Sequence, residues 1–294
     1  MPGSRPPTGG RAARRSSARR SGLTLEERVG RPWHVFATYL AAVAGIFATT
    51  AIAVETLHSI YPDVPESTLV RTLPGLLAGS LAASSGLLLT LLLVVRPLEP
   101  ARFRLLPGGE TGSTLLAAVV GLLALGQALD SLTVLLGVDA RGSLQLIRRL
   151  LEGARGPDLF GAVLVLGVVA GASEEIFFRG YMQSRLREHW PPAAAVLATS
   201  ASFAALHVDV SAVHMVLALA LGLYLGWITE LTGSALPAVV CHVINNALFT
   251  ILTASLGMIE GFRINVALGI GGTLVFAGCV AWLHVSPRVR RTTS

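Results

Sequence analysis

The amino-acid sequence predicts an all-α fold, a polytopic transmembrane bundle of about eight helices. Hydrophobic residues make up 52% of the 294 residues and charged residues only 14%, whereas a soluble chain carries roughly 25% charged residues. The apolar residues also fall in blocks of about 20, the length that crosses a hydrocarbon core roughly 30 Å thick. Together these observations exclude an ordinary soluble globular protein.

Eight candidate spans follow one another along the chain. They cover residues 33–54, 74–95, 113–138, 159–180, 193–208, 212–230, 235–256 and 264–284. Residues 1–30 have no apolar period and are rich in Arg, Ser, Gly and Pro, so they are predicted to form a disordered basic tail in the cytoplasm. No cleavable signal peptide is expected before the first span.

The basic residues indicate topology rather than a nucleic-acid partner. All 23 of them are arginine, which suggests a GC-rich bacterial genome and hence the bacterial cytoplasmic (inner) membrane. An even number of spans and Arg-rich ends place both termini in the cytoplasm. The loop 139–157 disagrees, because its four arginines would lie outside. Either its stretch Leu144 to Leu151 lies flat in the interface as an amphipathic segment, or one span is miscounted.

Three polar clusters lie in consecutive spans of the second half of the chain. Ionisable groups at membrane depth cost about 2.5–3.5 kcal/mol on insertion scales and are functional candidates by default. The clusters are Glu174, Glu175 and Arg179; Phe203 and His207; and His242 with Asn245 and Asn246.

The first cluster predicts a division of roles between its two carboxylates. Glu175 and Arg179 are four residues apart, so they share a helical face and can form an ion pair. Glu174 points about 100° away and is free to face a site. Taken alone, this cluster could equally be a paired anchor at the membrane edge.

The three clusters together supply a set suited to peptide hydrolysis. Glu174 can act as general base toward a water molecule that His207 helps to hold, while His242 and Asn246 can donate to the oxyanion of a tetrahedral intermediate. Alternatively, Glu174, His207 and His242 can bind zinc, since two histidines, a carboxylate and a water form a catalytic set. The residues leave this choice open, so no cofactor is certain and zinc is possible.

Other polar residues receive simpler interpretations. Asp130 and Gln127 in the third span are expected to serve packing or an interhelical hydrogen bond, and His214 is expected at the interface. Pairs of glycines four apart, Gly167 with Gly171 and Gly222 with Gly226, predict close helix packing. There is no His-Glu-x-x-His motif and no Gly-x-Ser-x-Gly motif.

The ordered motifs EExxxR, FxxxH and HxxxN resemble the CPBP family of intramembrane proteases, which includes the type II CAAX prenyl proteases and the lysostaphin-resistance protein A group. The likeness covers residues 158–256. It implies that Glu174 and His207 activate water, that His242 and Asn246 stabilise the oxyanion, and that Glu175, Arg179 and Phe203 support them.

With this resemblance the chain divides into five parts. These are the basic tail 1–30, transmembrane helices over 31–140, an amphipathic interfacial loop over 141–157, a catalytic core over 158–256, and a last helix with a basic tail over 257–294. The expected function is an intramembrane endopeptidase, either a metalloprotease or a glutamate protease. Its expected partners are the lipid bilayer and a peptide or membrane-protein substrate, with no nucleic acid. The alternative is a non-catalytic peptide-binding or immunity protein with the same fold.

Overall fold

The computed structural model describes residues 32–138, 142–208 and 212–286, and throughout these ranges the regular structure is helical. The prediction of an all-α polytopic bundle is confirmed. The tail predicted over residues 1–30, and the basic residues beyond 286, lie outside the described residues.

Eight apolar helices occupy the eight predicted positions. They are α2 (Pro32–Ile60), α4 (Leu73–Val94), α5 (Gly112–Leu135), the continuous helix Gly156–Arg187, α10 (Pro192–Ala205), α11 (Val213–Thr232), α12 (Leu236–Leu256) and α13 (Phe262–Val285). Shorter elements are α3 (Glu66–Leu69), η1 (Pro100–Phe103) and α6 (Gly142–Leu151).

Among the described residues, seven of these helices are long and apolar enough to cross a membrane. The exception is α10, which has 14 residues and is therefore about 21 Å long, short of the roughly 30 Å hydrocarbon core. The fifth predicted segment is thus a helix that reaches only part of the way through the bundle.

The continuous helix Gly156–Arg187 changes its winding around the first polar cluster. It consists of α7 (Gly156–Ala162), the π-helical segment η2 (Val163–Ala170), α8 (Gly171–Glu175), the π-helical segment η3 (Ile176–Gln183) and α9 (Ser184–Arg187). π-Helical turns are rare and frequently occur at functional sites. Here they flank α8, which carries Glu174 and Glu175.

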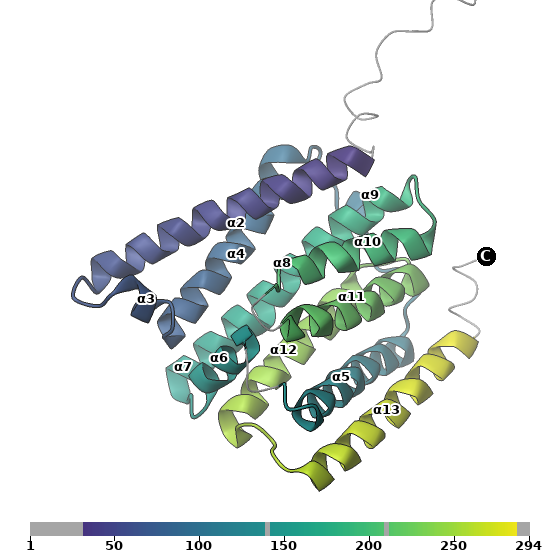
Figure 1. The fold of residues 1–294 in the computed structure, drawn as a ribbon. Helices are drawn as coiled ribbons and strands as arrows, with labels where there is room; N and C mark the ends of the chain where they lie inside the picture. The colour runs from purple at the N-terminus through teal and green to yellow at the C-terminus, as the bar shows by residue number, and fades with distance from the viewer. Residues whose placement is uncertain (1–31, 139–141, 209–211, 287–294) are drawn as a thin grey trace, which may run out of the picture.

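The helices form a central group with a pair on each side (Figure 1). α2 packs along α4 at one side, and α5 packs along α13 at the other. Between them lie α8, α10, α11 and α12, with α6 beside α12. The polar clusters therefore lie in the middle of the bundle, covered on both sides by helices that carry none of them.

Capping residues set the ends of several helices. Thr72 and Thr111 precede α4 and α5, and each side chain accepts a hydrogen bond from a backbone N–H of the first turn, as N-cap residues do. Gly233 follows α11 with φ of 73°, a left-handed conformation that glycine adopts without strain. This turn reverses the chain into α12.

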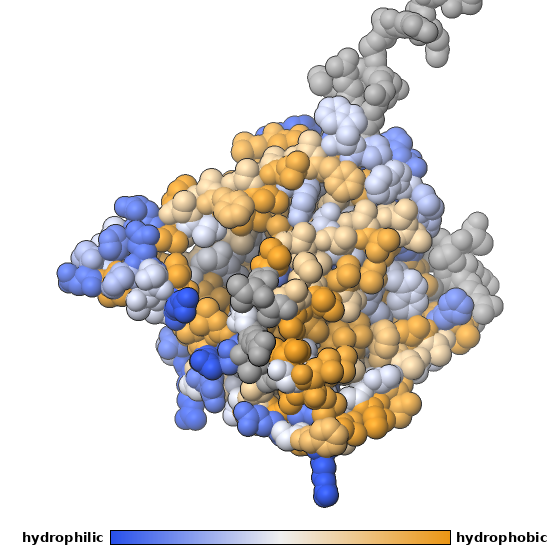
Figure 2. Space-filling view, viewed as in Figure 1, coloured by the Kyte–Doolittle hydropathy of each residue, from blue (hydrophilic) through white to orange (hydrophobic). Residues whose placement is uncertain are grey.

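Large apolar side chains cover the outside of the bundle. Phe47, Leu93 and Phe262 are between 72% and 77% exposed, as expected for side chains that face lipid. Figure 2 shows hydrophobic residues over much of the visible face and hydrophilic ones toward the ends of the helices, for example around α3. The surface is that of a multi-pass membrane protein.

Two glycines bring α12 against the helix of the first cluster. A Cβ atom on Gly167 would lie 3.1 Å from the Cα of Ala247, and one on Gly171 would lie 3.3 Å from the backbone nitrogen of Val243. The close packing predicted for this glycine pair is confirmed. It places the His242 face of α12 directly beside α8.

Candidate active site

The three polar clusters open into one cavity of about 690 Å³, a volume within the range of ligand sites. Its lining includes the predicted residues Glu174, Phe203, His207, His242 and Asn246. Most of the remaining lining is apolar and comes from α5, α6, α11, α12 and α13. The structure thus brings the residues of three separate sequence motifs to one place.

Glu175 is locked into a buried ion pair. Its Oε1 accepts a hydrogen bond from Arg179 Nη1 at 2.7 Å, and both side chains have no exposed surface. The other guanidinium nitrogen, Nη2, donates to the carbonyl oxygen of Gly222 on α11 at 2.8 Å. The ion pair predicted from the four-residue spacing is present, and it removes Glu175 from the cavity.

Glu174 has the opposite environment, although it is the next residue. Its side chain is 21% exposed and lines the cavity, with Oε2 lying 3.6 Å from His242 Nε2. That separation is too long for a direct hydrogen bond. Glu174 is therefore the carboxylate of this pair that a ligand in the cavity can reach.

His242 connects the two carboxylates. Its Nδ1 lies 2.8 Å from Glu175 Oε1, an oxygen that already accepts from Arg179. Because an ionised carboxylate has no proton to donate, Nδ1 carries the hydrogen and donates it to Glu175. The other ring nitrogen, Nε2, faces Glu174.

The charges of these four groups leave one proton to be shared. Glu175 and Arg179 neutralise each other, so Glu174 and His242 form a second neutral pair when they hold one proton between them. This proton lies either on the Glu174 carboxyl or on His242 Nε2. When the proton is on His242 Nε2, the Glu174 carboxylate can accept another proton, and the Nε2–H group can donate a hydrogen bond to a negatively charged oxygen.

The Phe203 ring contacts both histidines and Arg179. Its ring centroid is 4.7 Å from that of His207, 5.9 Å from that of His242 and 5.1 Å from Arg179 Cζ. His207 Nδ1 lies 3.0 Å from the Phe203 carbonyl oxygen, which can only accept, so Nδ1 is the donor. The remaining nitrogen, Nε2, is then an acceptor that can orient a water molecule.

Asn246 lies one turn beyond His242 on the same face of α12. Its Nδ2 donates to the Leu166 carbonyl oxygen at 3.2 Å, and its Oδ1 accepts from Asn245 Nδ2 at 3.3 Å. The amide nitrogen has two N–H groups, so one is left for a ligand in the cavity.

The histidines and carboxylates do not converge in the way that a metal ion requires. Over residues 32–138, 142–208 and 212–286, no group of three or more His, Cys, Asp or Glu side chains could hold a metal ion. Glu175 occupies His242 Nδ1 and a backbone carbonyl occupies His207 Nδ1, which leaves Nε2 of each ring, the atom that a zinc ion would need. As placed, Glu174, His207 and His242 do not form such a group.

The cavity also contains polar residues that had simpler interpretations in the sequence. His214 lines the cavity rather than standing only at an interface; its ring is 4.7 Å from that of His207, and Ser143 Oγ lies 2.9 Å from its Nδ1. Asp130 forms an ion pair with Arg148 of α6, so the interhelical contact expected of Asp130 is present. The helical spacing of these residues gave no sign of a shared cavity.

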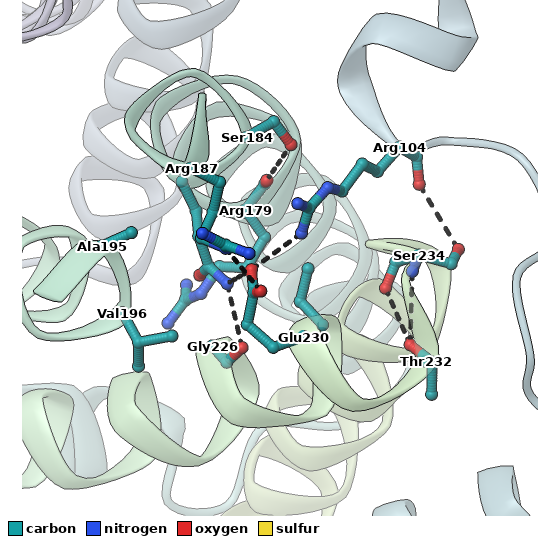
Figure 3. Close-up of polar contacts among 12 residues, drawn as sticks. Arg104, Arg179, Ser184, Arg187, Ala195, Val196, Gly226, Glu230, Thr232 and Ser234 are labelled. Atoms are coloured by element: carbon teal, nitrogen blue, oxygen red, sulfur yellow. Dashed lines mark hydrogen bonds and ion pairs between the residues drawn. The ribbon is translucent and has the colours of Figure 1, made fainter. Parts of the chain in front are cut away.

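A second ionic cluster, distinct from the cavity, lies where α9 meets the end of α11 (Figure 3). Glu230 accepts from Arg104 Nη1 and Arg187 Nε, each at 2.8 Å, and from Gln183 Nε2 at 2.9 Å. Gln183 also donates to the Gly226 carbonyl oxygen at 3.0 Å. Glu175, Arg179, Gln183 and Arg187 recur every four residues, a pattern that could have revealed this continuous polar face.

Comparison with known proteins finds a family model that matches the segment with the three motifs. Residues 156–248 match the family model described as type II CAAX prenyl endopeptidase Rce1-like, and this range includes Glu174, His207, His242 and Asn246. Comparisons with curated proteins and with solved structures give no match. The segment 156–248 thus resembles the Rce1-like family, and this match agrees with the CPBP resemblance drawn from the three motifs.

Proposed function

We propose that the protein is an intramembrane endopeptidase in which Glu174 activates a water molecule. The single observation that carries this proposal is the contrast between neighbouring carboxylates. Glu175 is buried and paired with Arg179 at 2.7 Å, whereas Glu174 opens into the cavity and faces His242. A general base must be accessible to the proton that it removes, and of these two groups only Glu174 is.

The proposed first step forms the tetrahedral intermediate. Glu174 takes a proton from a water molecule while the water oxygen bonds to the carbonyl carbon of the scissile peptide. The carbonyl oxygen becomes an oxyanion and accepts hydrogen bonds from His242 Nε2–H and Asn246 Nδ2–H, a form of stabilisation worth several kcal/mol in other hydrolases.

The second step breaks the peptide bond. Glu174 returns its proton to the peptide nitrogen as the C–N bond cleaves, so the products are a carboxylic acid and an amine. His207 Nε2 accepts a hydrogen bond from the attacking water and orients it, because the neighbouring Nδ1 is fixed on the Phe203 carbonyl.

The cavity fits a peptide or membrane-protein segment with apolar side chains. Its lining is mostly apolar, and the helices around it are long enough to hold it at membrane depth. We place the protein in a bacterial cytoplasmic membrane. Because the described histidines and carboxylates form no set of three or more that could hold a metal, the glutamate mechanism is preferred to the metal-dependent one.

The test compares the membrane peptidome of cells that express wild type, Glu174→Gln or Glu188→Gln. Glu188 is an exposed carboxylate on the same stretch of chain and serves as the matched control. Peptides that appear with wild type and Glu188→Gln but not with Glu174→Gln would support the proposal. A chelator treatment of the wild type, added as a fourth arm, should leave these peptides unchanged.

Identical peptidomes from all three strains, with each protein folded and equally abundant, would contradict peptidase activity. That result would favour a membrane protein that binds peptides without cleaving them. If chelator treatment of the wild type removes the products, the metal-independent mechanism is overturned, but the assignment as a peptidase stands.

A further inference from the structure

Arg148 is a buried cation in the wall of the cavity. It comes from α6, is 7% exposed and lines the same cavity as Glu174. The adjacent Arg149 is exposed. Two consecutive arginines of one short helix thus have opposite environments, and anchoring α6 at a surface requires only the exposed one.

The contacts of Arg148 use only part of its hydrogen-bonding capacity. Its Nη2 donates to Asp130 Oδ1 on α5, and its guanidinium lies over the Phe249 ring at 5.7 Å from the centroid. Its Nε is buried and has no hydrogen-bond partner among the described residues. A guanidinium has five N–H donors in a planar fork that matches a carboxylate.

The surroundings of this guanidinium raise the cost of leaving donors unused. Leu144, Ile147 and Leu151 of the same helix line the cavity beside it, as do Leu248 and Leu252 of α12. A buried polar group without a partner costs roughly 1–3 kcal/mol, and more when it is charged. Asp130, with its side chain 35% exposed, offsets the charge but leaves Nε unsatisfied.

We propose that Arg148 is an anion-binding subsite of this cavity, which receives a carboxylate of the bound peptide. The carboxylate belongs either to the free C-terminus or to an acidic side chain, since both present the same pair of oxygens. Asp130 offsets part of the charge of the guanidinium, and the carboxylate approaches the guanidinium from the cavity that Arg148 lines. The inference rests on the proposed peptide substrate and makes Arg148 a residue that determines specificity rather than a catalytic one.

The position of Phe249 indicates how far this subsite lies from the scissile bond. Phe249 follows His242 by seven residues on α12, which corresponds to about 10 Å along the helix axis at 1.5 Å per residue. An extended peptide covers about 10 Å in three residues. The recognised carboxylate is therefore expected about three residues from the bond that Glu174 and His242 attack.

The test measures binding, so that it does not depend on hydrolysis. Full-length protein carrying Glu174→Gln is reconstituted in nanodiscs, immobilised and offered an eight-residue peptide library. The library has four arms: free or amidated C-termini, each with one internal position fixed as Glu or Gln. Captured peptides are quantified by mass spectrometry, with Arg148→Gln and Asp130→Asn as test variants and Arg149→Gln as the matched control.

We expect the parent and Arg149→Gln to capture at least one carboxylate arm about tenfold more than the fully neutral arm. Arg148→Gln should lose that preference. Asp130→Asn should keep or increase it, because the competing carboxylate is gone. The free-terminus and glutamate arms show which source of carboxylate is recognised.

A merely structural ion pair predicts a different result. Arg148→Gln and Asp130→Asn break the same contact, so equal loss of capture in both variants would overturn the proposal. A preference unchanged in Arg148→Gln, or no capture by the parent, would overturn it as well. Failure of the peptidase proposal gives a different result. In that case the protein still captures peptides with a carboxylate selectively, but the wild type cleaves no peptide.

Discussion

His242 Nδ1 and Arg179 Nη1 donate to the same oxygen, Glu175 Oε1, at 2.8 and 2.7 Å. One carboxylate oxygen therefore fixes both the ion pair of the first motif and the imidazole of the third. The carboxylate next to it in the sequence, Glu174, is left for the cavity. The chemistry proposed for Glu174 depends on this neighbour holding the ring in place.

Replacement of Glu175 by Gln should damage the fold as well as the site. The change leaves Arg179 as an uncompensated charge with no exposed surface, and breaking a buried pair typically costs about 3–5 kcal/mol. Thermal unfolding in detergent should show a large loss of stability and a fall in membrane abundance. Glu174→Gln is the control, since it should lose cleavage with near-normal abundance. Equal instability of both variants would contradict the division of roles.

Replacement of Asn246 by Ala should reduce turnover more than binding. Loss of one oxyanion donor lowers kcat by about 10²–10³-fold in other hydrolases. Asn245→Ala serves for comparison, because Asn245 lines the same cavity but its Nδ2 donates to Asn246 Oδ1 at 3.3 Å. Kinetics on a peptide substrate deduced from the peptidome experiment would compare kcat and KM of the two variants. A larger loss of kcat in Asn245→Ala than in Asn246→Ala would identify Asn245 as the oxyanion donor.

Removal of the Glu230 charge should destabilise the bundle away from the cavity. Glu230→Gln weakens two hydrogen bonds from arginines, each at 2.8 Å, and hydrogen bonds to charged groups contribute about 1.5–3 kcal/mol each. Glu188→Gln breaks a comparable but exposed contact and should change stability by less than about 1 kcal/mol. Unfolding of both variants in detergent decides this, and similar values for the two would show that the Glu230 cluster contributes little.

Two glycines of α4 should respond with opposite signs to replacement by alanine. A Cβ on Gly86 would lie 2.6 Å from the backbone nitrogen of Ile46, whereas one on Gly79 meets nothing within 4 Å. Gly79→Ala should stabilise the helix by about 0.5–1 kcal/mol, and Gly86→Ala should push α2 away and cost about 1–3 kcal/mol. Unfolding temperatures in one detergent provide the measurement. Stabilisation by both variants would show that α2 and α4 are not in close contact.

The helical positions could be predicted from the sequence because hydrophobic runs of membrane length are a strong signal. The same signal could not show that α10 ends after 14 residues, because apolar residues, Leu206 and Val208, continue on both sides of His207 past the last helical turn. The ion pair of Glu175 and Arg179 was predictable from their spacing, since it lies within one helix.

Contacts between helices were less accessible to prediction. The approach of His242 to Glu175 depends on the close packing at Gly167 and Gly171, and spacing within a span gives no information on its neighbours. Arg148 is the instructive case. Its loop disagreed with the rule for positive residues, and the structure accounts for one of the four arginines: Arg148 is buried against Asp130 and is not a surface charge that reports topology, whereas Arg149 is exposed.

The four-residue repeat on the helix Gly156–Arg187 has a mechanical consequence. Arg179 and Gln183 donate to the carbonyl oxygens of Gly222 and Gly226, and Arg187 reaches Glu230, so each turn of one helix is bonded to the matching turn of α11. Sliding by even one turn would break all three contacts at once. These two helices are therefore expected to move together. We expect any motion that admits a substrate to come from other elements that line the cavity, among them α6.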